Sequence, residues 1–134
     1  ARKPAARVSV AKYPLRWPVR GKITRAFGRR GKKHHDGIDI IAGAGEPVHA
    51  AGSGKVVFAD EHGGYGKLIL VRHDSGVITV YAHQSELLVK KGQRVKGGQV
   101  IAKVGSTGNA EHPHLHFEVR KGIESKNPLQ FLPP

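Results

Sequence analysis

Short apolar runs rich in β-branched residues alternate with glycine-rich turns along most of this chain. The runs lie at residues 37–41, 47–50, 54–60, 67–73, 77–83, 99–105 and 115–120. Turn signals recur every ~8–12 residues, which is typical of β-sandwiches and barrels. No segment keeps a helical periodicity of apolar positions over a useful length, although residues 85–89 would fit one helical turn. The pattern therefore predicts an all-β domain.

Local turn chemistry refines this prediction. His-Asp-Ser-Gly at 73–76 predicts a hairpin between the runs at 67–73 and 77–83. We expect a short strand near 21–27 and a loop through 28–34, where glycines and cations interrupt the apolar pattern. The phrase Lys-Gly-x-x-Val-x-x-Gly-x-x-Ile at 91–101 indicates a tight crossover and resembles biotinyl- and lipoyl-type barrel-sandwich domains. That likeness concerns the fold alone.

The length of 134 residues suits one domain with its own core. No apolar run approaches the ~18 residues that a membrane span needs, and no signal-peptide pattern is present. Cysteine is absent, which excludes disulfides, thiol catalysis and cysteine zinc sites. Methionine is also absent, so we expect a processed protein or a piece of a longer one. We predict a flexible basic segment at 1–14 and a folded domain at 15–134.

The net charge of +13 is concentrated near the start of the chain. Residues 1–33 hold 12 lysines and arginines and no acid, whereas residues 34–134 hold 11 cations and 10 acids. One interpretation is a solvated basic linker. The other is an arm that holds the protein on an anionic surface, such as cell-wall polymer, lipid head groups or nucleic acid. The near-neutral remainder and its few aromatic residues argue against a nucleic-acid partner.

Nine histidines are the main chemical feature of the sequence. A zinc site without cysteine needs histidine and carboxylate ligands, and a catalytic site needs three of them. His35 and Asp39 stand four residues apart, which in a straight strand would separate their Cα atoms by ~13 Å. A bend at Gly37 would bring them closer. The pair is a ligand candidate, and the alternative is a surface loop with a His–Asp hydrogen bond.

A second cluster, His-Pro-His-Leu-His-Phe-Glu-Val, occupies residues 112–119. In a strand, His114 and His116 share one face at a spacing of ~6.6 Å, while the intervening Leu115 and its neighbour Phe117 point to the other. Adjacent buried imidazoles are costly without partners, which favours a metal or catalytic role over two exposed histidines. His112 is in phase as well, but Pro113 makes it a loop residue.

The remaining polar candidates carry weaker signals. His83 ends an apolar run, where side chains gather at the rim of a sheet, and a capping or surface role is the alternative. Glu118 follows the strand alternation onto the His114 face, where it would orient a ligand histidine or be a plain surface acid. Four further histidines have no partner phrase: His34, His49, His62 and His73.

Three phrases, taken together and in this order, resemble the lysostaphin/LytM-type zinc peptidoglycan endopeptidases of peptidase family M23. They are His35-x-x-x-Asp39, Tyr81-Ala82-His83 and His-Leu-His-Phe-Glu at 114–118. The similarity covers about residues 15–133. It implies an antiparallel β-sandwich related to barrel-sandwich hybrid folds. It also implies one Zn²⁺ per chain, bound by His35, Asp39 and His116.

The resemblance further implies that His83 and His114 are catalytic. A zinc-activated water would attack a peptide carbonyl, one of these histidines would accept its proton, and the other would stabilise the oxyanion or protonate the leaving amine. The sequence does not assign the two roles. The implied substrates are stem or bridge peptides of bacterial peptidoglycan, cut in the periplasm, the cell envelope or the medium. We expect a monomer.

Two features bear on substrate preference. The family loop before His-x-His usually has small residues, whereas 108–113 reads Gly-Asn-Ala-Glu-His-Pro. Tyr65 lies between glycines and either lines the cleft or stands at a hairpin tip. A non-catalytic module that binds wall peptide or activates an amidase is the competing interpretation, and the five intact polar positions argue against it. A lipoyl-type carrier would need a modifiable lysine in an acidic Asp-Lys phrase, which is absent.

Overall fold

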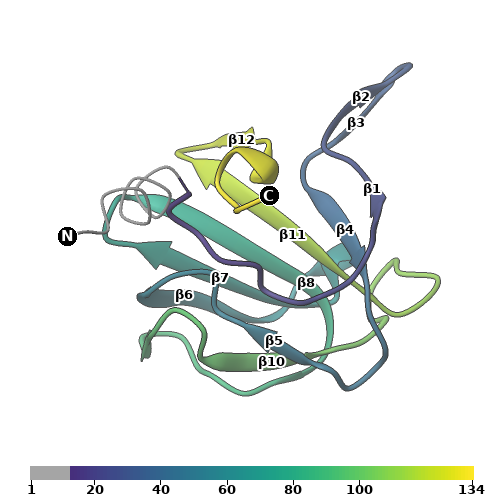
Figure 1. Ribbon diagram of the computed structural model, residues 1–134. Coiled ribbons are helices and arrows are strands. Elements are labelled where there is room, and N and C mark those ends of the chain that lie inside the picture. Colours follow the sequence, from purple (N-terminus) through teal and green to yellow (C-terminus); the bar gives the residue numbers. More distant parts are fainter. Residues whose placement is uncertain (1–12) are drawn as a thin grey trace.

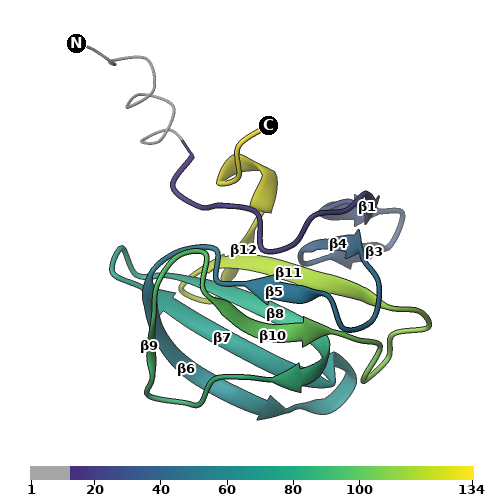
Figure 2. The same cartoon turned by 60° about the horizontal axis from the view of Figure 1, so that its bottom comes forward.

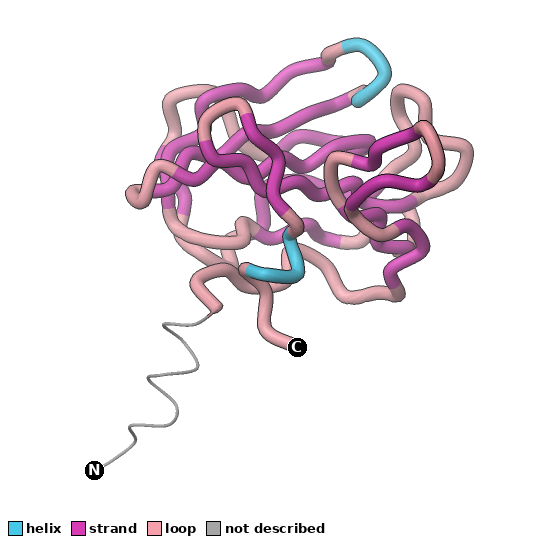
Figure 3. The backbone as a smooth tube through the Cα atoms, turned by 90° about the horizontal axis from the view of Figure 1, so that it is seen from above, coloured by secondary structure: helices cyan, strands magenta, loops and turns pink. Residues whose placement is uncertain are grey.

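The computed structural model describes residues 13–134 (Figures 1 and 2). Apart from Tyr13 and Pro14, the predicted flexible segment 1–14 lies outside the described residues. Among those residues, no helix has the length and apolar character to cross a membrane. The two short 3₁₀ helices, η1 (Gly63–Tyr65) and η2 (Pro128–Gln130), are the cyan segments in Figure 3. The elements not yet located are the strands β1 (Ile23–Arg25), β2 (Gly28–Arg30), β3 (Lys33–His35), β4 (Ile38–Ile41), β5 (Pro47–His49), β6 (Gly54–Glu61), β7 (Lys67–His73), β8 (Val77–Leu87), β9 (Arg94–Val95), β10 (Val100–Val104), β11 (His114–Lys121) and β12 (Glu124–Lys126).

Most strands belong to one antiparallel sheet in the order β1-β4-β11-β8-β7-β6-β9. Strand β10 pairs with the far end of β8 and with β5, and this branch lies across the longer strands (Figure 2). Strand β12 extends the sheet beside β11, while β2 and β3 form a separate hairpin. The predicted all-β, antiparallel sandwich is therefore confirmed.

The two faces of the large sheet have different roles. On β11, Leu115, Phe117 and Val119 are fully buried in the main core, as the strand alternation predicts. They pack with apolar side chains from the neighbouring strands and from the β5–β10 branch, including Ile38, Ile40, Val48, Ile69, Val71 and Ile101. The alternate positions of the same strands face the other way. There, Leu68, Val80 and Ala82 form a small second cluster, and the polar positions of β4 and β11 lie beside it.

Two local predictions were wrong. Residues 28–34 were expected to form a loop, but β2 and β3 pair there as a hairpin, because Gly31 adopts the positive φ of 60° that a tight turn requires. Residues 85–89 were expected to allow a helical turn, but β8 continues to Leu87 because it pairs there with β10. The predicted hairpin between β7 and β8 is confirmed, with Gly76 at a φ of 92°.

Two loops beside the sheet meet backbone to backbone. The amide of Asn109 donates to the carbonyl of Gly64 at 2.8 Å, which joins the 107–109 loop to η1. Gly108 has a φ of 74°, and a Cβ placed on it would overlap the Gly64 carbonyl and the Gly66 amide. The close contact therefore depends on glycine at this position.

We expect Gly108→Ala to lower the free energy of unfolding by about 2–3 kcal/mol, because it adds both backbone strain and overlap. The matched control is Gly122→Ala, since Gly122 has a similar φ of 63° but open space around it. That control should cost only about 1 kcal/mol. Chemical denaturation of both variants measures the difference, and equal losses would show that the loop contact contributes nothing.

A chain of hydrogen bonds crosses the buried polar part of the core. His73 Nδ1 lies 2.9 Å from the Ser53 carbonyl and must donate to it, so its Nε2 accepts from the Thr79 hydroxyl at 2.8 Å. Thr79 in turn accepts from the Tyr81 hydroxyl at 2.7 Å, and Tyr81 accepts from the Ala51 amide. Every donor in this series of hydrogen bonds has an acceptor when the ring of His73 is neutral, so His73 is a neutral structural histidine. Burial lowers its pKa from 6.5.

This lowered pKa makes the fold sensitive to acid. Below pH 6.5 the unfolded His73 takes up a proton while the folded residue stays neutral, so the free energy of unfolding falls as the pH drops. We expect His73→Gln, which does not titrate, to lose less stability between about pH 7 and about pH 5.5 than the wild type. Urea denaturation at both pH values tests this. Parallel losses in the two proteins would contradict it.

Candidate active site

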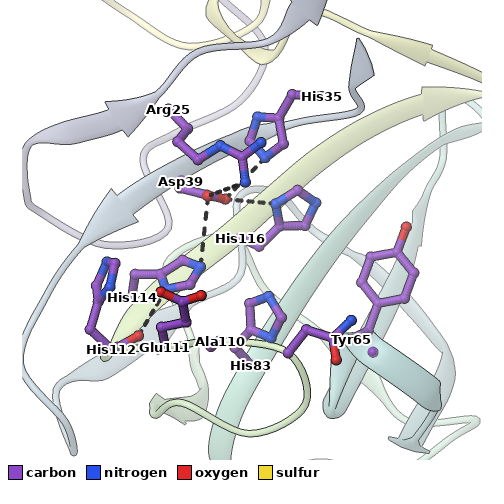
Figure 4. A pocket seen from close by; sticks show the side chains of 12 residues that line it. Arg25, His35, Asp39, Tyr65, His83, Ala110, Glu111, His112, His114 and His116 are labelled. Atoms are coloured by element: carbon purple, nitrogen blue, oxygen red, sulfur yellow. Dashed lines mark hydrogen bonds and ion pairs between the residues drawn. The ribbon is translucent and has the colours of Figure 1, made fainter. Parts of the chain in front are cut away.

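Polar side chains from four strands converge on the sheet face opposite the main core (Figure 4). Strand β4 pairs with β11 so that Asp39 stands directly opposite His116. His35 comes from the end of β3, just before the Gly37 bend, and His83 comes from β8. The converging groups line one cleft of about 520 Å³. Its lining residues are Arg25, His35, Asp39, Gly64, Tyr65, His83, 109–112, His114 and His116.

The three predicted metal ligands lie in direct contact with one another. His116 Nδ1 lies 2.7 Å from Asp39 Oδ1, and His35 Nε2 lies 3.3 Å from the same oxygen. One ligand atom from each residue lies within 4.8 Å of the others. Two imidazole nitrogens and one carboxylate are a donor set that zinc prefers, and three protein ligands are the number typical of catalytic zinc sites. The residues therefore fit a zinc ion.

The second ring nitrogen of each ligand histidine is also held. His35 Nδ1 is 3.0 Å from the Ala26 carbonyl, which only accepts, so Nδ1 carries the proton and Nε2 is free toward Asp39. His116 Nε2 is 2.7 Å from Glu118 Oε2, so Nδ1 is the atom turned toward Asp39. Such outer partners fix the ring orientation of metal ligands. The two histidines would thus bind through different nitrogens.

Electrostatics at this cluster favour an ionised carboxylate. Burial raises the pKa of Asp39, but the hydrogen bond from His116 and the nearby histidine rings together lower it overall. Burial lowers the pKa of His116, but its bonds to Asp39 and Glu118 raise it overall to about 9. A cation that binds His116 Nδ1 therefore displaces a proton, which makes metal binding weaker in acid.

His83 reaches the site through a backbone irregularity. Tyr81 points into the core, so simple alternation would also point His83 there. Between Tyr81 and Gln84, however, β8 holds one residue more than the facing part of β7, and His83 has a φ of 66°. Such a bulge redirects a side chain, and strained non-glycine residues of this kind gather at functional sites. The prediction that the strand ends at His83 was wrong, because β8 passes through the bulge.

The two predicted catalytic histidines are arranged alike. His83 Nδ1 is 2.8 Å from the Thr107 carbonyl, and His114 Nδ1 is 2.9 Å from the His112 carbonyl. Each Nδ1 therefore donates, and each Nε2 is left as an acceptor. The two ring centroids are 4.9 Å apart. Burial lowers the pKa of His83 despite the bond to Thr107, so this ring is neutral and able to take a proton near pH 7.

Glu118 lies behind His116 in a closed network. It is fully buried, and Oε2 accepts from His116 and from the Tyr65 hydroxyl at 3.0 Å. Its Oε1 accepts from Arg120 Nε at 2.7 Å. Burial raises the pKa of Glu118, but the bonds from His116 and Arg120 lower it overall. The sequence left Glu118 as either an acid that orients a ligand histidine or a plain surface acid. The structure buries Glu118 and bonds it to His116, a predicted ligand.

Sequence reasoning brought the five main residues to one place but missed their supports. Thr107 is the clearest case: its carbonyl orients His83 and its hydroxyl bridges the Gln84 carbonyl and the Lys67 amide. A carbonyl partner leaves no side-chain signal to read. Arg25, at 3.9 Å from Asp39, was also missed. His49 and His73, both without a partner phrase, bond to carbonyls away from the cleft. Of the two positions predicted for Tyr65, the cleft lining and a hairpin tip, the structure shows the cleft lining.

We expect Glu118→Gln to weaken zinc binding about 10–100-fold, because the ring of His116 loses its charged acceptor. Competition with a chromophoric chelator measures the affinity. Glu124→Gln, which changes an exposed acid on β12 by the same atoms, should leave it unchanged. Thermal denaturation of both variants checks folding. A folded Glu118→Gln protein with wild-type affinity would contradict the positioning role.

Comparisons with known proteins agree with this geometry. Two curated proteins of Escherichia coli strain K12 are similar over 88% of this chain. The uncharacterized lipoprotein YgeR is 45% identical over 121 residues, and the murein hydrolase activator NlpD is 42% identical over 119 residues. The chain spans 47% of the first and 31% of the second, so it matches less than half of either relative.

Solved structures show the same fold. A zinc-containing peptidase from Vibrio cholerae superimposes with a TM-score of 0.80 at 36% identity, covering 84% of this chain and 38% of that one. The catalytic domain of lysostaphin from Staphylococcus simulans gives a TM-score of 0.77 at 34% identity, covering 83% and 91%. The sequence profile of peptidase family M23 matches residues 33–128, which include all five residues of the cluster. This chain belongs to peptidase family M23.

Proposed function

We propose that this protein is a zinc-dependent endopeptidase that hydrolyses peptide cross-links or bridges in bacterial peptidoglycan. Membership of family M23 supports a role in peptide hydrolysis, and the name of the relative NlpD refers to murein. We place the peptidase domain at 15–134, around the matched region 33–128. The resemblance to YgeR, named a lipoprotein, supports a site of action in the cell envelope.

One observation carries the proposal. Five polar side chains line one cleft. One ring nitrogen of each histidine is held by a carbonyl or by Glu118, which turns the other nitrogen toward the cleft. For His116 that other nitrogen, Nδ1, is bonded to Asp39. Three of them, His35, Asp39 and His116, supply a zinc donor set. The other two, His83 and His114, supply proton acceptors beside it. A module that only binds its partner has no need for three metal ligands with two proton acceptors beside them.

The chain's own groups then account for the hydrolysis. Zinc, when bound, lowers the pKa of water and polarises a carbonyl oxygen. Either His83 or His114 accepts a proton at Nε2 as water attacks the peptide carbon. The C–N bond breaks, and the leaving amine takes up the proton. The other histidine, once protonated at Nε2, donates a hydrogen bond to the carbonyl oxygen while negative charge develops there. Glu118 holds His116 in place throughout.

The alternative is a non-catalytic module that binds wall peptide or activates a cell-wall amidase. The 42% identity to a protein named a murein hydrolase activator favours it. In either case we propose peptidoglycan peptides as the binding partner and a monomer as the working unit. We also propose that the basic N-terminal segment, most of which precedes the described residues, contacts an anionic wall or membrane surface.

The test is digestion of purified peptidoglycan by the zinc-loaded protein, with new amine ends detected by mass spectrometry. We expect cleavage by the wild type, and a loss of about 10²–10⁴-fold in His83→Ala and His114→Ala, which remove a proton acceptor but should keep about one zinc per chain. His116→Ala should lose the zinc as well, because it removes a ligand. His62→Ala, a histidine outside the metal cleft, is the control.

Intact muropeptide dimers after prolonged incubation with the zinc-loaded wild type would overturn the enzyme proposal. Amidase activation by the same uncleaving protein would then identify the alternative. Cleavage that persists in the double variant His83→Ala with His114→Ala would overturn the roles given to these two histidines.

A further inference from the structure

The β2–β3 hairpin carries four cations that have no acidic partner in the described part of the chain. Arg29, Arg30, Lys32 and Lys33 all lie in this hairpin, which projects from the body of the protein (Figure 1). None of the four forms an ion pair within residues 13–134. The nearest acid in sequence, Asp36, is instead bound by His34, Arg120 and Ser125. The hairpin therefore presents free positive charge.

The pairing of the hairpin places two of these cations against each other. Arg30 stands directly opposite Lys33 in the β2–β3 ladder. Like charges at directly opposed positions destabilise a pair of strands, and an isolated two-stranded hairpin has little stability to spare. An anion held between the two side chains would offset this repulsion. The arrangement is costly without a ligand and favourable with one.

A small pocket lies at this point. It measures about 250 Å³ and is lined by Thr24, Arg25, Ala26, Gly28, Arg30, Lys33 and His35. Three of these residues are cations and none is acidic. Arg25 and His35 also line the metal cleft, so the two cavities share a wall. An anion bound here is therefore next to a proposed zinc ligand, and the volume suits a carboxylate group with its adjoining carbons.

The opposite end of the metal cleft has the reverse charge. Figure 4 shows Arg25 and His35 on one side of Asp39 and His116, and Glu111 with His112 on the other. Apart from Asp39, Glu111 is the one acid among the cleft-lining residues in the described part of the chain. The cleft is thus basic toward the hairpin and acidic toward the 108–113 loop. A bound peptide with a free carboxylate is favoured with that group at the hairpin end.

We propose that Arg30 and Lys33, with Arg25, form a subsite that binds a free carboxylate of the wall peptide next to the bond to be cut. This inference rests on the proposed function and adds a substrate class to it: acidic peptides in preference to the same peptides with the carboxylate amidated. An arginine fork binds a carboxylate through two parallel hydrogen bonds, and a lysine adds a point charge.

The experiment compares a cross-linked stem peptide that has a free carboxylate with the same peptide after amidation of that group. Binding to zinc-loaded His83→Ala protein is measured by calorimetry, and cleavage by the wild type is measured separately. We expect the free carboxylate to bind about tenfold more tightly, in line with one charge-assisted pair. Arg30→Gln with Lys33→Gln, added to the same background, should reduce that ratio to near one, and Arg30→Lys alone should reduce it only in part.

The matched control is Lys90→Gln with Lys91→Gln, which removes two exposed cations outside the cleft lining and should preserve the ratio. Equal binding of both peptides by the parent protein would overturn the inference, as would an equal loss of preference in the control. A preference that is lost only in the hairpin variant upholds the inference. If neither peptide is cleaved by the wild type while that preference persists, the subsite stands and the proposed peptidase function fails.

Discussion

The contact between Asp39 and His116 is the constraint around which the site is arranged. It joins β4 to β11, and the ladder between these strands puts the two residues opposite each other. The carboxylate and Nδ1 lie 2.7 Å apart on a face where both side chains are buried. A buried carboxylate or imidazole without a hydrogen-bond partner would destabilise the fold. The remaining polar atoms of this pair are therefore bonded to further residues. Glu118 takes up the far nitrogen of His116, and Tyr65 and Arg120 complete the shell of Glu118.

The same sheet separates stability from chemistry. Along β11, alternate residues enter the main core or face the cleft, so the apolar packing of Leu115 and Phe117 fixes the positions of His114 and His116. The bulge in β8 then adds His83 from a strand whose alternation would otherwise hide it. The irregular loops orient three of these histidines through the backbone carbonyls of Ala26, Thr107 and His112. Rigid strands carry the reactive groups, and loops set their proton positions.

Much of this arrangement could be predicted from the sequence because period-two alternation is a local property. It placed His114, His116 and Glu118 on one face. The turn residues at 73–76 separately predicted that the runs at 67–73 and 77–83 pair as a hairpin. The β2–β3 hairpin was missed because its residues are charged, and its strands pair through a turn at Gly31 without an apolar pattern. The bulge at His83 and the carbonyl partner Thr107 were beyond reach because both depend on backbone geometry set by neighbouring strands. The residue roles themselves remain predictions.

The most direct test of the account is the location of zinc in crystals of the zinc-loaded protein by anomalous scattering at the zinc edge. The account predicts one peak per chain, at about 2.0–2.2 Å from His35 Nε2, from an Asp39 carboxylate oxygen and from His116 Nδ1. His83 Nε2 and His114 Nε2 should face the ion without binding it. A peak elsewhere, or one bound through His116 Nε2 with Glu118 displaced, would contradict it.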